Sequence, residues 1–189
     1  MTGMEWDEAD LEFKLLPENM TATLLRSSML LTGWEFIRSD IIEGVRGFFV
    51  AGWDKSDAEV LDPDYQQHVA SKVVKGSVTI FDASVAWLVE MEALTSDDVK
   101  LLRRVREHRN EVAHELAKYL VDPSADVSIE LLFEVRDVIR RLGQFWGRIA
   151  VATNKEFDGQ EIAPEDIRSG SSLLFDFILS LTNLEREGR

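Results

Sequence analysis

One stretch of the chain combines two guanidinium groups, an amide and an imidazole at helical spacing. Arg106, Asn110 and His114 stand four residues apart, and Arg109 stands beside Asn110. Residues four apart lie on one face of a helix, so these polar side chains would project from one side of the segment. An arginine can donate two parallel hydrogen bonds to a phosphate, and a histidine can transfer protons near neutral pH. The spacing therefore indicates phosphodiester chemistry, in which Asn110 would orient the histidine or the substrate.

Arg109 occupies a position at which the surrounding pattern requires an apolar side chain. A helical wheel places position 109 within the apolar stripe of the segment. An arginine that faces a core costs free energy unless it is paired or faces a solvated cleft. Arg109 therefore either forms a structural ion pair, with Glu35 as candidate partner, or lies in a cleft, where Glu35 would position it. The apolar stripe consists of Leu102, Val105, Val112, Leu116 and Tyr119.

The charge of the chain is strongly acidic, with a local exception. The 189 residues contain 21 Lys and Arg against 35 Asp and Glu, a net charge of −14. Long-range repulsion of phosphates would make RNA capture slow and weak, and would suit a basic protein partner. Residues 100–109 hold five Lys and Arg against one acid, so this strip is basic. We expect Arg103 and Arg106, within the strip, to bind substrate.

The segment from Arg109 to His114 resembles the signature of the HEPN domain family, an arginine and a histidine separated by four to six residues. That resemblance implies a helical bundle that dimerises and places two copies of the motif across a shared cleft. Active members are metal-independent endoribonucleases of toxin–antitoxin and phage-defence systems. On this similarity Arg109 and His114 would be the catalytic pair, with Asn110 as the polar residue after the arginine and with no metal or cofactor.

The elements that must position these residues are helical. Only four prolines and eleven glycines interrupt the chain, and apolar residues recur at spacings of three and four. We expect an all-α, single-domain HEPN-like bundle of four to five long helices over residues 1–189, with 1–18 as an N-terminal extension. Residues 51–62 read as a loop. The expected helices are a short one at 5–16, long ones at 19–50, 63–94, 97–121 and 126–153, and a last one that begins at Pro164 or near Ser169–Ser172.

Composition excludes several classes of protein. Without cysteine there is no disulfide framework, iron–sulfur cluster, thiolate zinc site or cysteine nucleophile. No apolar run reaches the roughly 18 residues of a membrane span. The acidic N-terminus has no basic stretch before an apolar run, as a secretory signal would. We therefore expect a cytoplasmic protein.

Three functional hypotheses follow. The first is a dimeric, metal-independent endoribonuclease of toxin or anti-phage defence type, with RNA as substrate and an antitoxin or other protein as partner. The second is a catalytically inactive HEPN-like module that binds a protein or a nucleotide, with the Arg/His pair at the dimer interface. The third is a carboxylate metal bundle, for which Glu111 and His114 supply one Glu-x-x-His copy.

Overall fold

The protein is all-α, as predicted. The computed structural model describes residues 7–160 and 162–181, which form seven α-helices, three short 3-10 helices and one two-stranded antiparallel hairpin. The strands are β1 (Val50–Trp53) and β2 (Glu59–Leu61). The helices are α1 (Glu8–Lys14), α2 (Pro17–Phe48), α3 (Pro63–His68), α4 (Ile80–Glu90), α5 (Ser96–Val121), α6 (Ile129–Thr153) and α7 (Gly170–Leu181).

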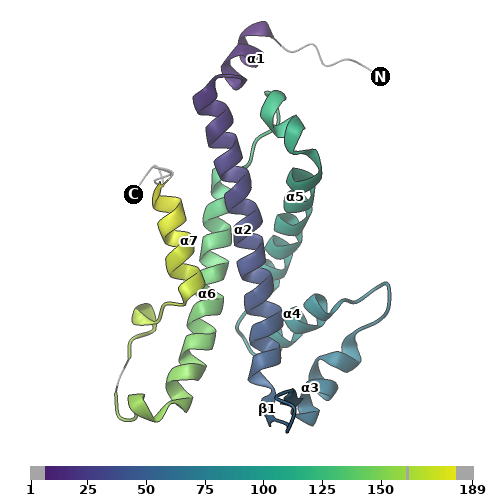
Figure 1. Cartoon of the computed structure of the whole chain (residues 1–189), viewed down its shortest axis with the longest axis vertical. Coiled ribbons are helices and arrows are strands. Elements are labelled where there is room, and N and C mark those ends of the chain that lie inside the picture. The colour runs from purple at the N-terminus through teal and green to yellow at the C-terminus, as the bar shows by residue number, and fades with distance from the viewer. Residues whose placement is uncertain (1–6, 161, 182–189) are drawn as a thin grey trace.

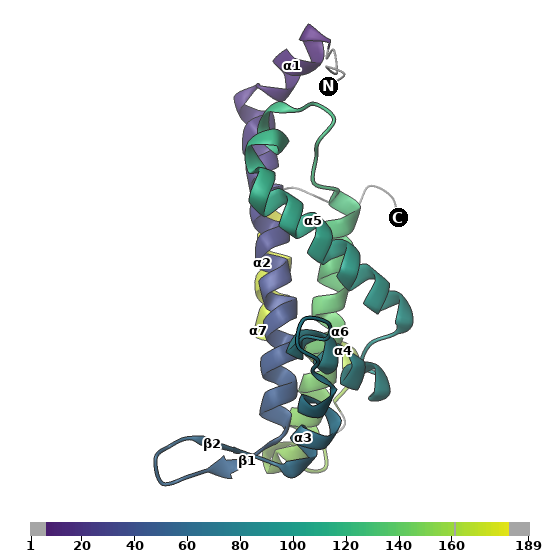
Figure 2. The same cartoon turned by 90° about the vertical axis from the view of Figure 1, so that its right-hand side faces the viewer.

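Helix α2 is the central element, and it contacts α4, α5, α6 and α7. It runs along most of the length of the molecule, with α6 beside it (Figure 1). Helix α1 lies beyond one end of this bundle, and the β1–β2 hairpin extends away from the other end (Figure 2). Among the residues described, no helix combines the length and the apolar character that crossing a bilayer requires.

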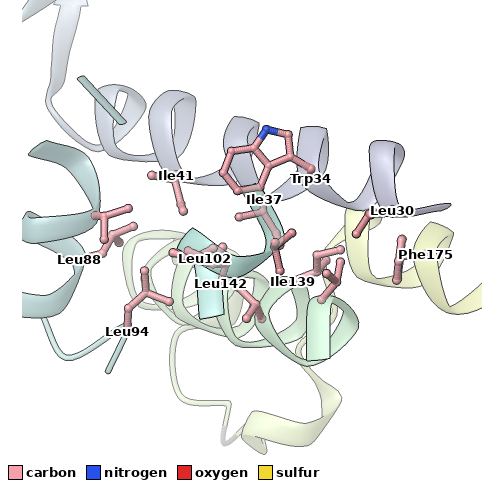
Figure 3. Close-up of a cluster of buried hydrophobic side chains, with 14 of the residues drawn as sticks. Leu30, Trp34, Ile37, Ile41, Leu88, Leu94, Leu102, Ile139, Leu142 and Phe175 are labelled. Atoms are coloured by element: carbon pink, nitrogen blue, oxygen red, sulfur yellow. The ribbon is translucent and has the colours of Figure 1, made fainter. Parts of the chain in front are cut away.

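The core lies between α2 and α6 and is closed by α4, α5 and α7 (Figure 3). Gly33 lets these helices approach closely, because a Cβ there would meet the Val135 and Phe175 side chains at 2.6 and 2.8 Å. Burial of such apolar surface is the main favourable term in folding. The fully buried side chains include Leu30, Ile37 and Ile41 of α2, Leu88 of α4, Ile139 and Leu142 of α6, and Phe175 of α7.

The prediction of one helix over residues 63–94 is wrong. Helix α3 ends at His68, a 3-10 turn follows, and α4 begins only at Ile80. Gly76 stands between them with φ +78°, a conformation that L side chains rarely adopt, and Val74 and Val78 form an isolated bridge around it. The chain therefore makes a turn inside the segment that the apolar spacing predicted as continuous.

The prediction of a loop over residues 51–62 is also wrong, because most of it forms the β1–β2 hairpin. Asp54 organises the connection: its carboxylate accepts hydrogen bonds from the amides of Ser56 and Ala58 at 2.7 and 3.1 Å. Asp57 has φ +58°, the left-handed conformation that aspartate tolerates in turns. Trp53 of β1 remains 65% exposed, so little of the hairpin is core.

The first and last described helices follow the prediction more closely. Helix α1 lies within the predicted 5–16, of which residues 5 and 6 fall outside the described part. Lys14 ties α1 to the bundle, because its Nζ donates to the Ala125 carbonyl at 2.7 Å. Pro164 begins only a 3-10 turn, and the last helix starts at Gly170, the later of the two predicted positions.

Candidate functional site

Helix α5 carries the predicted site, and a capping box fixes its start. Thr95 Oγ1 accepts a hydrogen bond from the Asp98 amide at 3.2 Å, and the Asp98 carboxylate accepts one from the Thr95 amide at 2.8 Å. The same carboxylate, which is buried, accepts a 2.5 Å hydrogen bond from Arg141 of α6. One side chain therefore both begins α5 and anchors it to α6.

Arg109 lies in the apolar stripe, as its spacing predicted. Val105 and Val112, one turn away on either side, are fully buried, whereas the Arg109 side chain is 29% exposed. Its Nη2 donates to Glu35 Oε1 of α2 at 3.0 Å, and its Nη1 donates to Asn110 Oδ1 at 3.3 Å. Its Nε is buried and has no hydrogen-bond partner among the residues described. The ion pair with Glu35 thus leaves the guanidinium only partly satisfied.

Arg109 faces a pocket of about 470 Å³ between three helices, which we name the arginine pocket. Small-molecule sites typically have volumes of this order. The lining comes from the middle of α2, from the start of α4 and from the middle of α5. The lining residues are Trp34, Glu35, Arg38 and Ile42; Thr79, Ile80 and Phe81; and Arg106, Arg109 and Asn110.

Charge in the arginine pocket is opposite in sign to that of the whole chain. Three arginines and one glutamate line it, and Asp82 pairs with Arg106 beside it, which leaves one positive charge in excess. Glu35 stands between two of these arginines, since its carboxylate lies 3.0 Å from Arg109 and 3.8 Å from Arg38. The pocket is therefore an anion-attracting site in a protein whose net charge is −14.

Asp82 lies at the edge of this pocket and pairs with Arg106 at 4.0 Å. Partial burial of Asp82 favours its neutral form, but hydrogen bonds from Thr79 and the charges of Arg106 and Arg103 outweigh that effect and lower the pKa of the carboxyl. Asp82 also completes the capping box of α4 with Thr79. It therefore joins the start of α4 to the α5 face that carries the arginines.

His114 does not line the arginine pocket; its side chain is exposed. It stands five residues after Arg109, which on a regular helix is about 140° around the axis. The next residue, Glu115, has non-helical angles (φ −123°, ψ 30°), so α5 is kinked directly after the histidine. Within one chain the structure joins Arg106, Arg109 and Asn110 in one pocket and leaves His114 outside it.

Arg103 is also separate from the arginine pocket. It lines a neighbouring groove between α4 and α5, of about 420 Å³, with Val85, Val89 and Leu102. Arg106 borders both cavities. The two arginines that we expected to bind substrate thus face different hollows.

The basic strip at residues 100–109 carries less free charge than its sequence indicates. Lys100 pairs with Asp97 at 2.8 Å, and Arg104 pairs with Glu134. Arg106 and Arg109 pair with Asp82 and Glu35. All four pairs involve exposed or half-exposed side chains, and such pairs exchange partners at small energetic cost.

His108, on the same helix, is partly buried. Its side chain is 21% exposed, and its ring packs edge-on against Tyr119, with Nδ1 3.4 Å from the Tyr119 hydroxyl. Burial and the neighbouring Glu111 carboxylate raise the pKa of Tyr119 to about 12. The spacing of eleven residues, three helical turns, was the signal in the sequence that could have paired the two rings.

Sequence reasoning missed the α4 wall of the arginine pocket and, of the α2 wall, named only Glu35. Arg38 and Ile42 fell within the predicted helix 19–50 without a role in the site, and Thr79 fell in the middle of the predicted helix 63–94. The start of α4 does carry a local signature, the capping box Thr79-x-x-Asp82, of the same type as Thr95-x-x-Asp98. Recognition of that box would have placed a helix N-terminus here.

No group of three or more histidine, aspartate or glutamate side chains that could hold a metal ion exists in the described ranges. Glu111 and His114, half of the hypothetical metal bundle, therefore have no third ligand there. Comparison of the chain with protein-family models, with curated proteins and with solved structures gives no match in any of the three.

Proposed function

We propose that the chain is an HEPN-like, metal-independent endoribonuclease of toxin or anti-phage defence type that acts on RNA as a cytoplasmic homodimer. The observation that supports this proposal most directly is Arg109. It interrupts a buried apolar stripe and opens into a pocket that two further arginines line. Such a pocket attracts phosphate groups, and the Arg109–His114 spacing matches the motif that the resemblance implies.

The chemistry requires few groups. Arg109 would bind the scissile phosphate and stabilise the charge that develops on it. The 2′-oxygen of the preceding ribose would attack the phosphorus, with His114 accepting its proton. The bond from phosphorus to the 5′-oxygen would break, and that oxygen would take up a proton. The products would be an RNA fragment with a 2′,3′-cyclic phosphate and one with a 5′-hydroxyl.

In this proposal a second copy of the chain completes the site, because one copy does not bring Arg109 and His114 together. His114 is exposed and about 140° around α5 from Arg109 on a regular helix, so the two groups do not share a pocket in a single chain. Two copies with their α5 helices face to face would create a cleft bordered by both motifs. An antitoxin or another protein partner would regulate access to that cleft.

The test is cleavage of single-stranded RNA in EDTA by the wild type, Arg109→Gln and His114→Ala. We expect each variant to lose about 100-fold or more in rate, as removal of a general base or an oxyanion ligand usually does. Arg104→Gln is the matched control, because Arg104 lies on the same helix but outside the arginine pocket. Cleavage at equal rates by all four proteins would overturn the assignment.

One observation favours a second candidate, a catalytically inactive module that binds a protein or a nucleotide. Arg109 is already engaged by Glu35, and His114 lies outside the pocket. On this alternative the purified wild type would bind its ligand but cut RNA under no condition. Arg109→Gln would then weaken dimer formation, measured by sedimentation velocity, and neither the wild type nor the variant would cleave RNA.

A further inference from the structure

Two arginines of the pocket have no role in the cleavage chemistry proposed above. Arg38, on α2, has a side chain that is 54% exposed, and its partner is Glu35 at 3.8 Å. Arg106, on α5, is 48% exposed, and its partner is Asp82 at 4.0 Å. Both distances are close to the longest that an ion pair spans, so an anion that lies nearer could bind either guanidinium group.

The start of α4 adds donors to the same pocket. Thr79 caps the amide of Asp82, the third residue of the helix. The amides of Ile80 and Phe81 precede it and, like the first amides of any helix, have no partner within the helix. Both residues line the pocket, as do the arginines of α2 and α5. A helix N-terminus stabilises an anion that approaches it.

One wall of the pocket is apolar. Ile42, Ile80 and Phe81 are partly exposed there, and Phe81 packs on the buried Trp34 with ring centroids 5.3 Å apart. A site for inorganic phosphate alone needs no such wall. The volume of about 470 Å³ is in the range of small-molecule sites, so the pocket has room for an organic body beside an anionic group.

From these features we infer that the arginine pocket binds a phosphate monoester of a molecule that also carries an aromatic ring, with Arg38 and Arg106 as phosphate ligands. A monoester offers three terminal oxygens to these arginines, whereas a diester within an RNA strand offers two. The inference rests on the proposed function in one respect, that the ring is a nucleobase. The source is then a free nucleotide or the 5′-phosphate of an RNA strand.

Glu35 acts in this inference as an internal competitor. Its carboxylate holds Arg109 and Arg38 in the absence of ligand, in the region that a phosphate would enter. A phosphate must therefore displace Glu35 from at least one arginine. Removal of the Glu35 charge should therefore strengthen phosphate binding. If Glu35 only held the arginines in place, its removal would weaken phosphate binding instead.

The test is isothermal titration of the full chain, at low salt, with each common ribonucleoside 5′-monophosphate. We expect binding that weakens about tenfold in Arg38→Gln and in Arg106→Gln, since each removes a charged hydrogen bond. In Glu35→Gln we expect binding about two- to fivefold tighter. Arg104→Gln is again the matched control and should bind like the wild type. Thermal unfolding of each variant checks that the fold is intact.

Further ligands distinguish the possible sources. Adenosine should bind much more weakly than its monophosphate; equal binding would overturn the phosphate assignment, and equal binding of inorganic phosphate would overturn the ring assignment. A 2′-O-methyl oligoribonucleotide with a 5′-phosphate, compared with its 5′-hydroxyl form, tests the RNA end as the source. None of these ligands is cleaved. Binding without RNA cleavage would refute the proposed function alone, and cleavage without nucleotide binding would refute this inference alone.

Discussion

Arg109 and Glu35 form an ion pair whose side chains are 29% and 51% exposed. A pair of this kind contributes at most about 1 kcal/mol to folding, because water screens both charges. The apolar residue that the stripe would otherwise carry at position 109 would stabilise the core by more. The stability of the fold therefore does not explain an arginine at this position, whereas the binding role that we propose would.

Asp40, on the far side of α2 from this pair, is the residue whose titration should affect stability. Its Oδ1 accepts a hydrogen bond from Ser171 at 3.3 Å, and its Oδ2 is buried without a partner among the described residues. Burial raises the pKa of the Asp40 carboxyl, and the Ser171 hydrogen bond only partly offsets that effect. The folded state thus holds the Asp40 proton more tightly than the unfolded state does.

Stability should therefore fall as pH rises through the raised pKa of Asp40. We expect the free energy of unfolding of the wild type, minus that of Asp40→Asn, to become more negative between pH 4 and pH 7. Urea unfolding of both proteins at several pH values measures this difference. A difference that does not change with pH would show that the Asp40 carboxyl titrates alike in both states.

Asp54 provides a control of opposite sign. Hydrogen bonds from Ser56 and Ala58 lower the pKa of its carboxyl, so its contribution to stability exists at neutral pH and is lost as pH falls. The same subtraction for Asp54→Asn should therefore become more positive as pH rises. The two variants together separate the titration of these carboxyls from a general effect of pH on the fold.

At the scale of the elements, close approach of α6 and α7 to α2 holds the bundle together. It depends on Gly33, where an added Cβ would meet the Val135 and Phe175 side chains at 2.6 and 2.8 Å. Phe175 is fully buried, so it cannot move aside without disturbing the core. Packing, rather than backbone conformation, thus requires a glycine at position 33.

We expect Gly33→Ala to lower the free energy of unfolding by about 1–3 kcal/mol, the usual cost of an overpacked core. Gly47→Ala is the matched control, because Gly47 lies in the same helix and a Cβ there would meet nothing within 4 Å. That substitution should raise the free energy of unfolding by at most about 0.5 kcal/mol, because Gly47 lies in the last turn of α2, where helix propensity has less effect than in the interior. Similar unfolding midpoints for the two variants would refute the close approach at Gly33.

At the scale of the whole molecule, His114 is exposed and stands directly before the kink of α5 at Glu115. The arginine pocket lies further back along the same helix, where α2 and α4 enclose it. A single copy therefore presents the two parts of the candidate site on different faces, and the proposed chemistry requires assembly.

We predict that the active species is a dimer, because one chain does not bring Arg109 and His114 into one pocket. Sedimentation velocity at micromolar concentration should give twice the mass of the chain. The specific rate of RNA cleavage should fall on dilution through the dissociation range, measured on the same samples. A monomer with an undiminished specific rate would contradict the shared cleft and would require His114 to act without a second copy.

The sequence alone determined the features that depend on neighbouring residues. The predicted helix 97–121 agrees with α5 (Ser96–Val121) to within a residue, because the signals that begin and end a helix act over a single turn. The position of Arg109 in an apolar stripe, and Glu35 as its candidate partner, also followed from the sequence. The same spacing failed over residues 63–94, because apolar residues continued through the turn at Gly76 and concealed it.

Only the tertiary structure decided which of the chemically active residues meet. The arginine pocket joins residues 34–42, 79–81 and 106–110, and no spacing rule relates these three segments. Their approach results from burial of the apolar faces of α2, α4 and α5 in a common core, and the polar side chains at the rim follow that packing. Arg38 therefore enters the site although its own helix gave no sign of it, and His114, aligned by spacing with Asn110, remains outside.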